Sequence, residues 1–312
     1  MILSALFLAV IVRAIRFRAT AIKQIVGNLI LLHGVVVVAQ IVVPPLKEYM
    51  APLVAFPKDM LAIRSFGLVG SYDMASLYIC VGMVIFVSRY MEKRKERYIL
   101  SLLFLWGAGL FTGRMFMITG TLILLLAVVA IIWRSGLMTR VWVVICSTGA
   151  LAIFWVTFGP FLLASMGLLE ADNYNLNSNF LTDGSYYIGT LGVMVRHIFL
   201  PSDPINLFLG GLPDPPSDNG YVRLIYTTGV IGLTWMLFAY IYMASAVWMK
   251  RVLDRWVVVA TIILILIYNV KMLMIGARGI TELLLLLTYS AYSGSRGSLT
   301  NSRQAVRRIV SV

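Results

Sequence analysis

Long apolar runs dominate this sequence and decide what the chain can fold into. Several of them reach the roughly 17–25 residues that a helix needs to cross a bilayer. Only 12% of the residues are charged, 60% are hydrophobic, and the mean hydropathy is +0.91, whereas soluble domains are about one quarter charged. The sequence therefore predicts an all-α, polytopic integral membrane protein, folded as an irregular helical bundle.

About nine apolar segments can be read from the sequence, with bounds defined to within a few residues. Several are shorter than a full membrane span. The segments are Met1–Val12, Ile25–Val43, Met74–Val87, Ile99–Thr112, Met115–Trp133, Val141–Phe158, Tyr221–Trp248, Trp256–Ile275 and Glu282–Tyr292.

Basic residues alternate between the loops that join these segments. One set of loops holds 18 of the 26 Lys and Arg residues but only 3 of the 13 Asp and Glu residues. The positive-inside rule places this set in the cytoplasm. It comprises Arg13–Lys23, Arg89–Arg97, Arg134–Arg140, Met249–Arg255 and the residues after Tyr292. The other set, which is predicted to face outward, comprises Pro44–Asp73, Gly113–Arg114, Gly159–Gly220 and Gly276–Thr281.

These loops give a simple domain organisation. Residues 1–292 form the predicted membrane domain, which includes a large external loop, 159–220, and residues 293–312 form a basic tail. We expect this tail to be disordered on the anionic inner leaflet. The net charge of +13 is explained by this loop topology, so no nucleic-acid partner is implied.

The N-terminus does not resemble a cleavable signal peptide, because its basic residues follow the first apolar segment. A helix over Met1–Val12 would rise only about 18 Å, short of a roughly 30 Å hydrocarbon core. We expect the chain to start either inside a helix of a longer ancestral protein or at a late start codon.

The external loop is predicted to be partly ordered. A helix over Ser185–Leu200 is expected to lie in the membrane interface, with Pro201 and Pro204 ending it. The chain then turns back to the membrane through Gly210-Gly211 and a proline-rich stretch. Asp218 precedes the next helix and is well placed as its N-cap.

Arginines gather on the outward side of the predicted bundle. They are Arg64, Arg114, Arg196, Arg223 and Arg278. A guanidinium in or near apolar surroundings is costly unless an anion meets it. Too few carboxylates lie nearby to pair with all of them, which favours a shared anionic ligand such as a phosphate-bearing lipid.

Several of these residues also have simpler interpretations. Arg114 is alternatively an orientation signal or a snorkelling side chain. Arg196 could instead pair with Asp203 or Asp183, and Arg64 and Arg278 could contact lipid headgroups.

Other polar residues in apolar surroundings are predicted to be structural. His33 is expected to form a hydrogen bond within the bundle, and Lys271 to snorkel from a helix end. Cys80 and Cys146 lie in apolar runs and are read as small buried residues. The sequence contains no clustered His and Asp set and no Asp-x-Asp pair, so no metal and no cofactor is predicted.

The segment Ser217–Gly232, which begins Ser-Asp-Asn-Gly-Tyr-Val-Arg, resembles the end of the large periplasmic loop in the O-antigen polymerase and ligase family. Three further pieces follow the order of that family: Arg64–Asp73 before a helix, the turn Thr112-Gly113-Arg114, and Arg196 followed by Pro204 and Gly210-Gly211. The resemblance covers roughly residues 61–280. Ligases of the family usually carry a His before the motif Asn, where this chain has Asp218, so a polymerase is favoured.

The resemblance implies a metal-independent glycosyltransferase of the bacterial inner membrane with the large loop in the periplasm. Its substrate would be an undecaprenyl-diphosphate-linked glycan, polymerised into O-antigen or exopolysaccharide. Arg114 and Arg196 are expected to hold the diphosphate, with Arg64 and Arg278 as weaker helpers. Arg223 is expected to bind sugar or phosphate, and Asn219 to contribute to substrate binding.

Asp218 and His197 are both candidates for the general base. Asp218 could instead serve only as an N-cap, and His197 could instead only pack in the membrane interface. A chain-length regulator and a flippase are possible partners besides the lipid bilayer. Two other functions also stay open, a ligase and a flippase or transporter of an anionic lipid-linked glycan. The sequence shows no internal repeat and no matched pair of broken helices, which disfavours a transporter.

Overall fold

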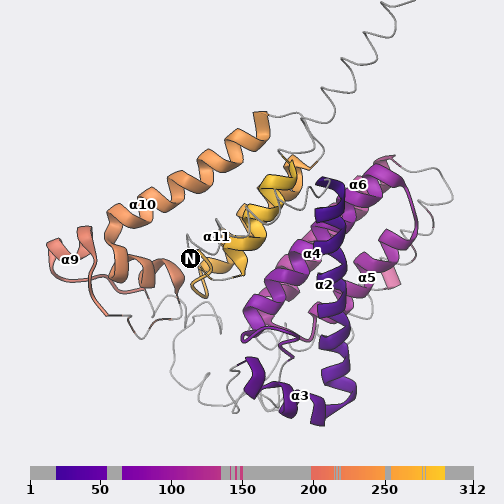
Figure 1. Ribbon diagram of the computed structural model, residues 1–312, viewed down its shortest axis with the longest axis horizontal. Helices are drawn as coiled ribbons and strands as arrows, with labels where there is room; N and C mark the ends of the chain where they lie inside the picture. Colours follow the sequence, from indigo (N-terminus) through magenta and orange to yellow (C-terminus); the bar gives the residue numbers. More distant parts are fainter. Residues whose placement is uncertain are drawn as a thin grey trace, which may run out of the picture. The chain divides into compact units, whose positions relative to one another are not determined.

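A computed structural model describes most of the membrane-segment candidates (Figure 1). The described residues are 19–54, 65–134, 141, 145, 148–149, 198–213, 215, 217, 219–249, 254–275, 277 and 279–291. The chain divides into two compact units, Met1–Leu125 with Leu233–Val312, and Leu126–Gly232. We call them the first and the second unit.

The described residues are helical and contain no β-strand. The elements are α2 (Ala19–Val42), α3 (Pro44–Met50), the 3₁₀ turn η1 (Pro52–Val54), α4 (Tyr72–Lys93), α5 (Arg97–Gly109), α6 (Arg114–Arg134), α9 (Pro204–Leu209), α10 (Gly220–Met249), α11 (Arg255–Asn269) and the helix Ile280–Ala291. Four of them, α2, α4, α6 and α10, are long and apolar enough to cross a bilayer.

These helices confirm most of the predicted segments that fall on described residues. The segment Met115–Trp133 corresponds to α6 and Tyr221–Trp248 to α10, each within one residue at both ends. In the predicted segment Trp256–Ile275, helix α11 ends at Asn269, six residues before the predicted end. Met1–Val12 and most of Val141–Phe158 lie outside the described residues.

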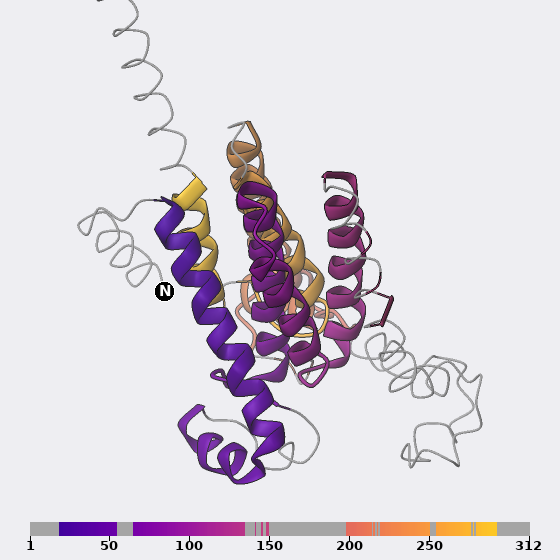
Figure 2. The same cartoon turned by 90° about the vertical axis from the view of Figure 1, so that its right-hand side faces the viewer.

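The central helix of the first unit is α4, which packs against α2, α5 and α11 (Figure 2). Gly82 on α4 permits the close approach of its neighbours. A Cβ at this position would lie 2.4 Å from Cγ2 of Ile30 on α2 and 2.9 Å from Cδ1 of Leu105 on α5. Both contacts are shorter than any real Cβ makes, so the residue must be small for α4 to occupy the core.

The predicted outward stretch Pro44–Asp73 includes helical turns. It includes α3 and η1, and two prolines open α3, where their fixed φ suits the first helical turn. The chain then runs through residues 65–71 into α4. The side chain of Ser71 begins this helix by accepting a hydrogen bond from the N–H of Asp73 at 3.3 Å.

In the second unit, the chain before α10 is partly helical. Asp203 caps α9 by accepting the N–H of Asn206 at 3.2 Å. The backbone N–H groups of Gly211 and Leu212 then donate to the carbonyls of Thr227 and Tyr226 at 3.1 and 3.0 Å. Of the predicted interfacial helix Ser185–Leu200, residues 185–197 lie outside the described residues and 198–200 are not helical.

The helix α10 is broken, a feature that the predicted continuous segment Tyr221–Trp248 missed. Gly229 has φ 69° and ψ 177°, which no helix accommodates. The carbonyls of Tyr226 and Thr227, which precede this break, bond instead to the segment after α9. An interrupted helix of this kind is a feature of transporters, which the sequence had disfavoured.

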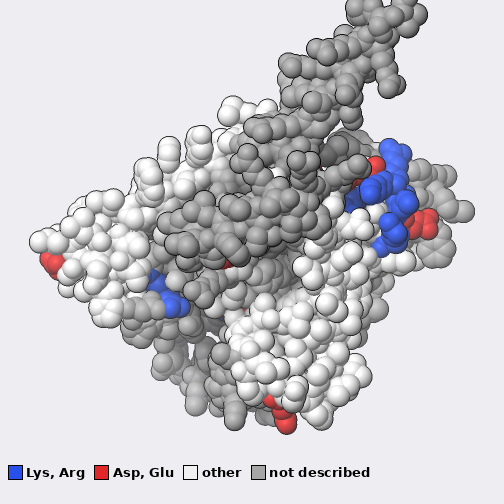
Figure 3. All heavy atoms as spheres, viewed as in Figure 1, with Lys and Arg blue, Asp and Glu red and all other residues white. Residues whose placement is uncertain are grey.

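Charged residues of the first unit collect at the two ends of α4. At its C-terminal end, Lys23 pairs with Glu92 and with Asp254. Exposed basic residues crowd the turn into α5, as Figure 3 shows; they are Lys93, Arg94, Lys95 and Arg97. The three predicted cytoplasmic segments that contain Lys23, Glu92 and Asp254 therefore meet at one end of a helix roughly 33 Å long.

Candidate functional site

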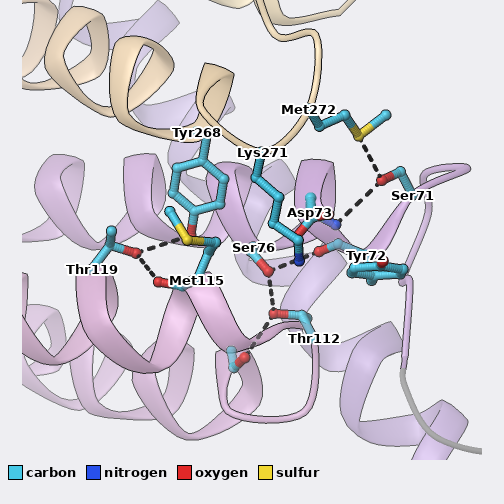
Figure 4. A network of polar contacts seen from close by, with 11 residues as sticks. Ser71, Tyr72, Asp73, Ser76, Thr112, Met115, Thr119, Tyr268, Lys271 and Met272 are labelled. Carbon is cyan, nitrogen blue, oxygen red and sulfur yellow. Dashed lines mark hydrogen bonds and ion pairs between the residues drawn. The ribbon is translucent and has the colours of Figure 1, made fainter. Parts of the chain in front are cut away.

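Polar side chains cluster at the opposite, N-terminal end of α4 (Figure 4). They come from predicted outward segments or from positions close to them. We call this group the α4 polar cluster and define it as Ser71, Asp73, Ser76, Thr112 and Lys271. All five belong to the first unit.

The α4 polar cluster centres on an ion pair. Nζ of Lys271 lies 3.0 Å from Oδ1 of Asp73, and the two side chains are only 13% and 6% exposed. The same Nζ lies 5.0 Å from the centre of the Tyr72 ring, close enough for a cation–π contact. The prediction that Lys271 snorkels was wrong, because its ammonium group points inward to a buried carboxylate.

A hydroxyl pair adjoins the ion pair. Oγ of Ser76 and Oγ1 of Thr112 are 2.8 Å apart, and Oγ1 of Thr112 also donates to the carbonyl of Gly109. Next to Thr112, a Cβ at Gly113 would lie 3.0 Å from Oγ of Ser76 and 3.3 Å from Oδ1 of Asp73. The turn between α5 and α6 therefore lies directly on the first turn of α4.

A second polar group lies further along the same helices. Oη of Tyr268 is 3.0 Å from Oγ1 of Thr119 and 3.5 Å from Sγ of Cys80. Cys80 and Tyr268 are fully buried. These hydrogen bonds satisfy polar atoms within an apolar core, and the buried state predicted for Cys80 is confirmed. Cys146 lies outside the described residues.

The segment after Arg64 is anchored on two sides. The N–H of Ser65 donates to the carbonyl of Phe111 at 3.0 Å. Oε1 of Gln40 accepts the N–H groups of Phe66 and Gly67 at 3.2 and 3.0 Å.

A histidine fixes the next residue of this segment. Nδ1 of His33 accepts the N–H of Leu68 at 3.1 Å, which confirms the predicted hydrogen bond of His33 within the bundle. Gly67, with φ +63°, lies against the imidazole, since a Cβ there would be 2.3 Å from its Cε1. The chain just after Arg64 is thus held at the turn that leads into α6.

The residue that follows Arg278 also lies against α4. A Cβ at Gly279, whose φ is +79°, would lie 2.3 Å from Oη of Tyr78 on α4. The N–H of Gly279 donates to Oε2 of Glu282, and that of Ala277 to the carbonyl of Met274 at 3.1 Å.

Three predicted arginines are therefore neighbours in the chain of described residues that contact α4 or the turn between α5 and α6. Arg114 is the first residue of α6, and its backbone follows Gly113. Ser65 directly follows Arg64, and Ala277 and Gly279 flank Arg278. Arg64 and Arg278, and the side chain of Arg114, lie outside the described residues.

The remaining predicted site residues fall in the second unit. Asn219 caps α10, because its Oδ1 accepts the N–H groups of Tyr221 and Val222 at 3.0 and 3.3 Å. The capping side chain is therefore Asn219, one residue after the predicted Asp218. Arg223 is half-buried in the first turn of α10. Arg196, His197 and Asp218 lie outside the described residues.

Sequence reasoning missed the ion pair at the centre of the α4 polar cluster. In the sequence analysis, Asp73 is only the end of a motif and Lys271 a snorkelling side chain at a helix end. A signal was present, because Asp73 directly precedes the predicted segment Met74–Val87 and Lys271 is a charged residue within Trp256–Ile275, near its predicted outward end. Their pairing joins positions 198 residues apart, which no local pattern encodes.

Among the residues that the structure describes, no three His, Cys, Asp or Glu side chains form a group suited to a metal ion. No family model, curated protein or solved structure matches this chain.

Proposed function

We propose that this protein is an integral-membrane glycosyltransferase that polymerises lipid-linked oligosaccharide repeat units. The donor would be a growing glycan on undecaprenyl diphosphate, and the acceptor a sugar hydroxyl of a new repeat unit. The product would be O-antigen or exopolysaccharide, made at the outer leaflet of a bacterial inner membrane. The proposal includes about nine membrane segments, a periplasmic loop 159–220 and a basic cytoplasmic tail.

One observation carries the proposal most directly. The backbone next to Arg64 bonds through Ser65 to Phe111, in the turn between α5 and α6. Gly113, which precedes Arg114, lies on the first turn of α4, and Gly279, which follows Arg278, lies against the Tyr78 hydroxyl of α4. We infer that the guanidinium groups carried by these segments share an anion, which offsets their mutual repulsion. A diphosphate has the charge and the oxygen atoms to serve all of them.

The chemistry requires charge stabilisation more than activation. The glycosidic leaving group is already a diphosphate, and its negative charge grows as the bond to the anomeric carbon breaks. Fixed guanidinium groups interact most strongly with that charge in the transition state. We assign this role to Arg114 and Arg196, with Arg64 and Arg278 as weaker contributors. Arg223 would contact sugar or phosphate.

Asn219 has a smaller place in this proposal. Its Oδ1 is engaged in capping α10, so any contact with substrate would come from its amide nitrogen. Asp218 and His197 remain candidates for the general base.

A flippase for an anionic lipid-linked glycan is the second candidate. The break at Gly229 favours it, because transporters bind substrates at interrupted membrane helices. Against it, the predicted arginines belong to outward segments, whereas a path across the bilayer needs charges at several depths. A ligase, which transfers finished glycan to another acceptor, is the third.

A gene deletion separates these functions. Loss of a polymerase leaves single repeat units on the surface acceptor and no long ladder. Loss of a ligase leaves polymer on the carrier lipid and no capped acceptor, and loss of a flippase traps repeat units inside the cell. Electrophoresis of surface glycan, together with mass spectrometry of extracted carrier lipid, distinguishes all three. An unchanged ladder in the deletion strain would contradict the proposal.

A further inference from the structure

We propose that the turn between α4 and α5 is a binding surface for the headgroups of anionic phospholipids. The surface consists of Lys93, Arg94, Lys95 and Arg97, all of which are exposed (Figure 3). We call it the basic surface. It lies at the opposite end of α4 from the α4 polar cluster, so this inference goes beyond the proposed glycosyltransferase and does not depend on it.

The basic surface carries more positive charge than the carboxylates beside it neutralise. Residues 93–97 hold four basic side chains and one acidic side chain, Glu96. Two further carboxylates at this end of α4, Glu92 and Asp254, are both paired with Lys23. The excess charge attracts an anionic membrane surface, where each Lys or Arg near the headgroups strengthens binding about fivefold.

The guanidinium group of Arg97 is fixed by the side chain of Tyr98. Nη2 of Arg97 and Nη2 of Arg89 each donate to Oη of Tyr98 at 3.2 Å. Both guanidinium groups also lie over the Tyr98 ring, with Cζ 5.1 and 4.8 Å from its centre. Two cations that share one neutral oxygen repel each other, and a phosphate bound to the exposed Arg97 reduces that repulsion.

The partner arginine, Arg89, is buried behind this contact. It is only 4% exposed, and its Nη2 also donates to Oε1 of Gln24 at 3.1 Å. Its two hydrogen-bond partners are therefore both uncharged, so its positive charge adds to the attraction for an anion at Arg97.

Arg94 occupies a backbone conformation that disfavours its side chain. It ends α4 with φ 49° and ψ 37°, and its N–H donates to the carbonyl of Tyr90 at 2.7 Å. Glycine is the usual residue in this conformation, because a Cβ is unfavourable there. Among the described residues, every other residue with a positive φ is glycine. The arginine therefore indicates a role for the guanidinium group beyond ending the helix.

Two tryptophans indicate that this end of the first unit lies at a membrane surface. The ring centres of Trp248 and Trp256 are 4.5 Å apart, and the two residues are 41% and 55% exposed. Cζ of Arg255 lies 4.7 Å from the centre of the Trp248 ring. Exposed tryptophans at the ends of apolar helices are typical of the headgroup region of a bilayer.

Ion pairs connect these tryptophans to the basic surface. Asp254, two residues before Trp256, pairs with Lys23, and Lys23 also pairs with Glu92. Glu92 directly precedes Lys93 in the chain. The basic surface therefore lies at the level of the headgroup phosphates, which favours a lipid over a soluble anion as its ligand.

An orientation signal alone does not explain these features. The positive-inside rule requires only that basic residues are present in a loop. It requires neither the contacts between Arg97 and Tyr98 nor the left-handed backbone of Arg94.

Native mass spectrometry of the detergent-solubilised protein tests the proposal. The protein is titrated with phosphatidylglycerol, or with phosphatidylcholine of the same acyl chains, and the two dissociation constants are compared. We expect the wild type to bind phosphatidylglycerol at least about tenfold more tightly, and Arg94→Gln with Arg97→Gln to lose at least about tenfold of this preference. Equal binding of the two lipids by the wild type, or an unchanged preference in the double variant, would overturn the proposal.

A matched control separates a local surface from the net charge of the protein. Lys47→Gln with Lys58→Gln also removes two positive charges, from the predicted outward stretch Pro44–Asp73. Its preference for phosphatidylglycerol should stay within about twofold of the wild-type value, because distant charges are screened. An equal loss of preference in the two double variants would contradict a local surface.

A charge-preserving variant keeps the test valid if loss of two basic residues alters folding or orientation. Arg94→Lys with Arg97→Lys retains both charges and removes the planar guanidinium groups. After size-exclusion chromatography confirms a folded protein, we expect the preference for phosphatidylglycerol to fall at least about threefold. A wild-type preference in this variant would overturn the role of the guanidinium groups.

Glycerol phosphate distinguishes a lipid from a soluble phosphate. It carries the same phosphate chemistry without acyl chains. Added at the concentration of the lipid, it should not displace bound phosphatidylglycerol from the wild-type protein. Displacement would assign the surface to a soluble anion and would overturn the assignment to a lipid.

Discussion

Single charged residues decide how the two ends of α4 are held. Lys23 is only 3% exposed and pairs with Glu92 and Asp254, with Oγ of Ser88 at 3.5 Å. Its ammonium group therefore joins α2, the end of α4 and the residue before α11. At the other end, Lys271 joins the segment after α11 to Asp73.

Removing the Lys23 charge should destabilise the first unit. Lys23→Met would leave Glu92 and Asp254 near each other without their cation, at a cost of about 3 kcal/mol. Thermal unfolding in detergent, followed by size-exclusion chromatography, should show a clearly lower midpoint. Lys95→Met, at an exposed position on the neighbouring turn, is the control and should change stability by less than about 0.5 kcal/mol. Equal midpoints for the two variants would refute the ion-pair assignment.

Arg114 should be required for chain growth and not for folding. Arg114→Ala is expected to abolish long glycan chains, a loss of at least about 100-fold in rate, with normal protein abundance. Arg114→Lys should also be impaired, since lysine lacks the planar fork that binds two phosphate oxygens. Glycan ladders from a complemented deletion strain give the measurement, with Arg303→Ala in the basic tail as the control. A normal ladder from Arg114→Ala would remove this residue from the site.

At the scale of elements, the broken helix α10 shows how a non-helical residue is accommodated. The break leaves the carbonyls of Tyr226 and Thr227 without their usual helical donors, and Leu212 and Gly211 supply new ones. Glycine is required at position 229 for two reasons. Its φ of 69° disfavours residues with a Cβ, and a Cβ there would lie 2.1 Å from the carbonyl oxygen of Phe208.

Alanine at position 229 should therefore destabilise the protein. We expect a cost of about 1–3 kcal/mol for Gly229→Ala, because the new Cβ meets backbone atoms that cannot move aside. Gly107→Ala is the matched control, since no atom lies within 4 Å of its Cβ position in α5. It should be neutral or stabilising by up to about 1 kcal/mol. The same thermal unfolding measurement applies, and equal midpoints for both variants would contradict the strained contact.

At the scale of the whole molecule, charged segments sort between the two ends of α4. Three of the predicted cytoplasmic segments meet around Lys23, and the predicted outward segments Pro44–Asp73 and Gly113–Arg114 meet around Asp73. This sorting agrees with the alternation of loop charges along the sequence. Which end faces the cytoplasm remains a prediction of the positive-inside rule.

Cysteine labelling tests that orientation. In a protein with Cys80→Ser and Cys146→Ser, Lys95→Cys should react with a membrane-impermeant maleimide only after spheroplasts are permeabilised. Ser202→Cys, at an exposed position of the predicted external loop, should react in intact spheroplasts. The reversed pattern would invert the orientation, and labelling of both sites from one side would contradict the alternating topology.

The sequence alone located the long helices, although α2 begins six residues before the predicted segment Ile25–Val43 and α4 ends six residues after Met74–Val87. The prediction Met115–Trp133 matches α6 to one residue at each end, because apolar length is a local property. The end of α11 needed tertiary information. Asn269 accepts the N–H groups of Met274 and Ile275 at 2.9 and 3.1 Å, so the chain turns within an apolar run.

Only the tertiary structure brought the candidate site together. The sequence identified the segments that carry Arg64, Arg114 and Arg278, but not that Ser65 bonds to the turn before α6 or that Gly113 and Gly279 lie against α4. It also gave no sign that Asp73 and Lys271 are paired. Hydrophobicity acts residue by residue and can be read along the chain, whereas ion pairs and broken helices depend on partners that folding brings from distant positions.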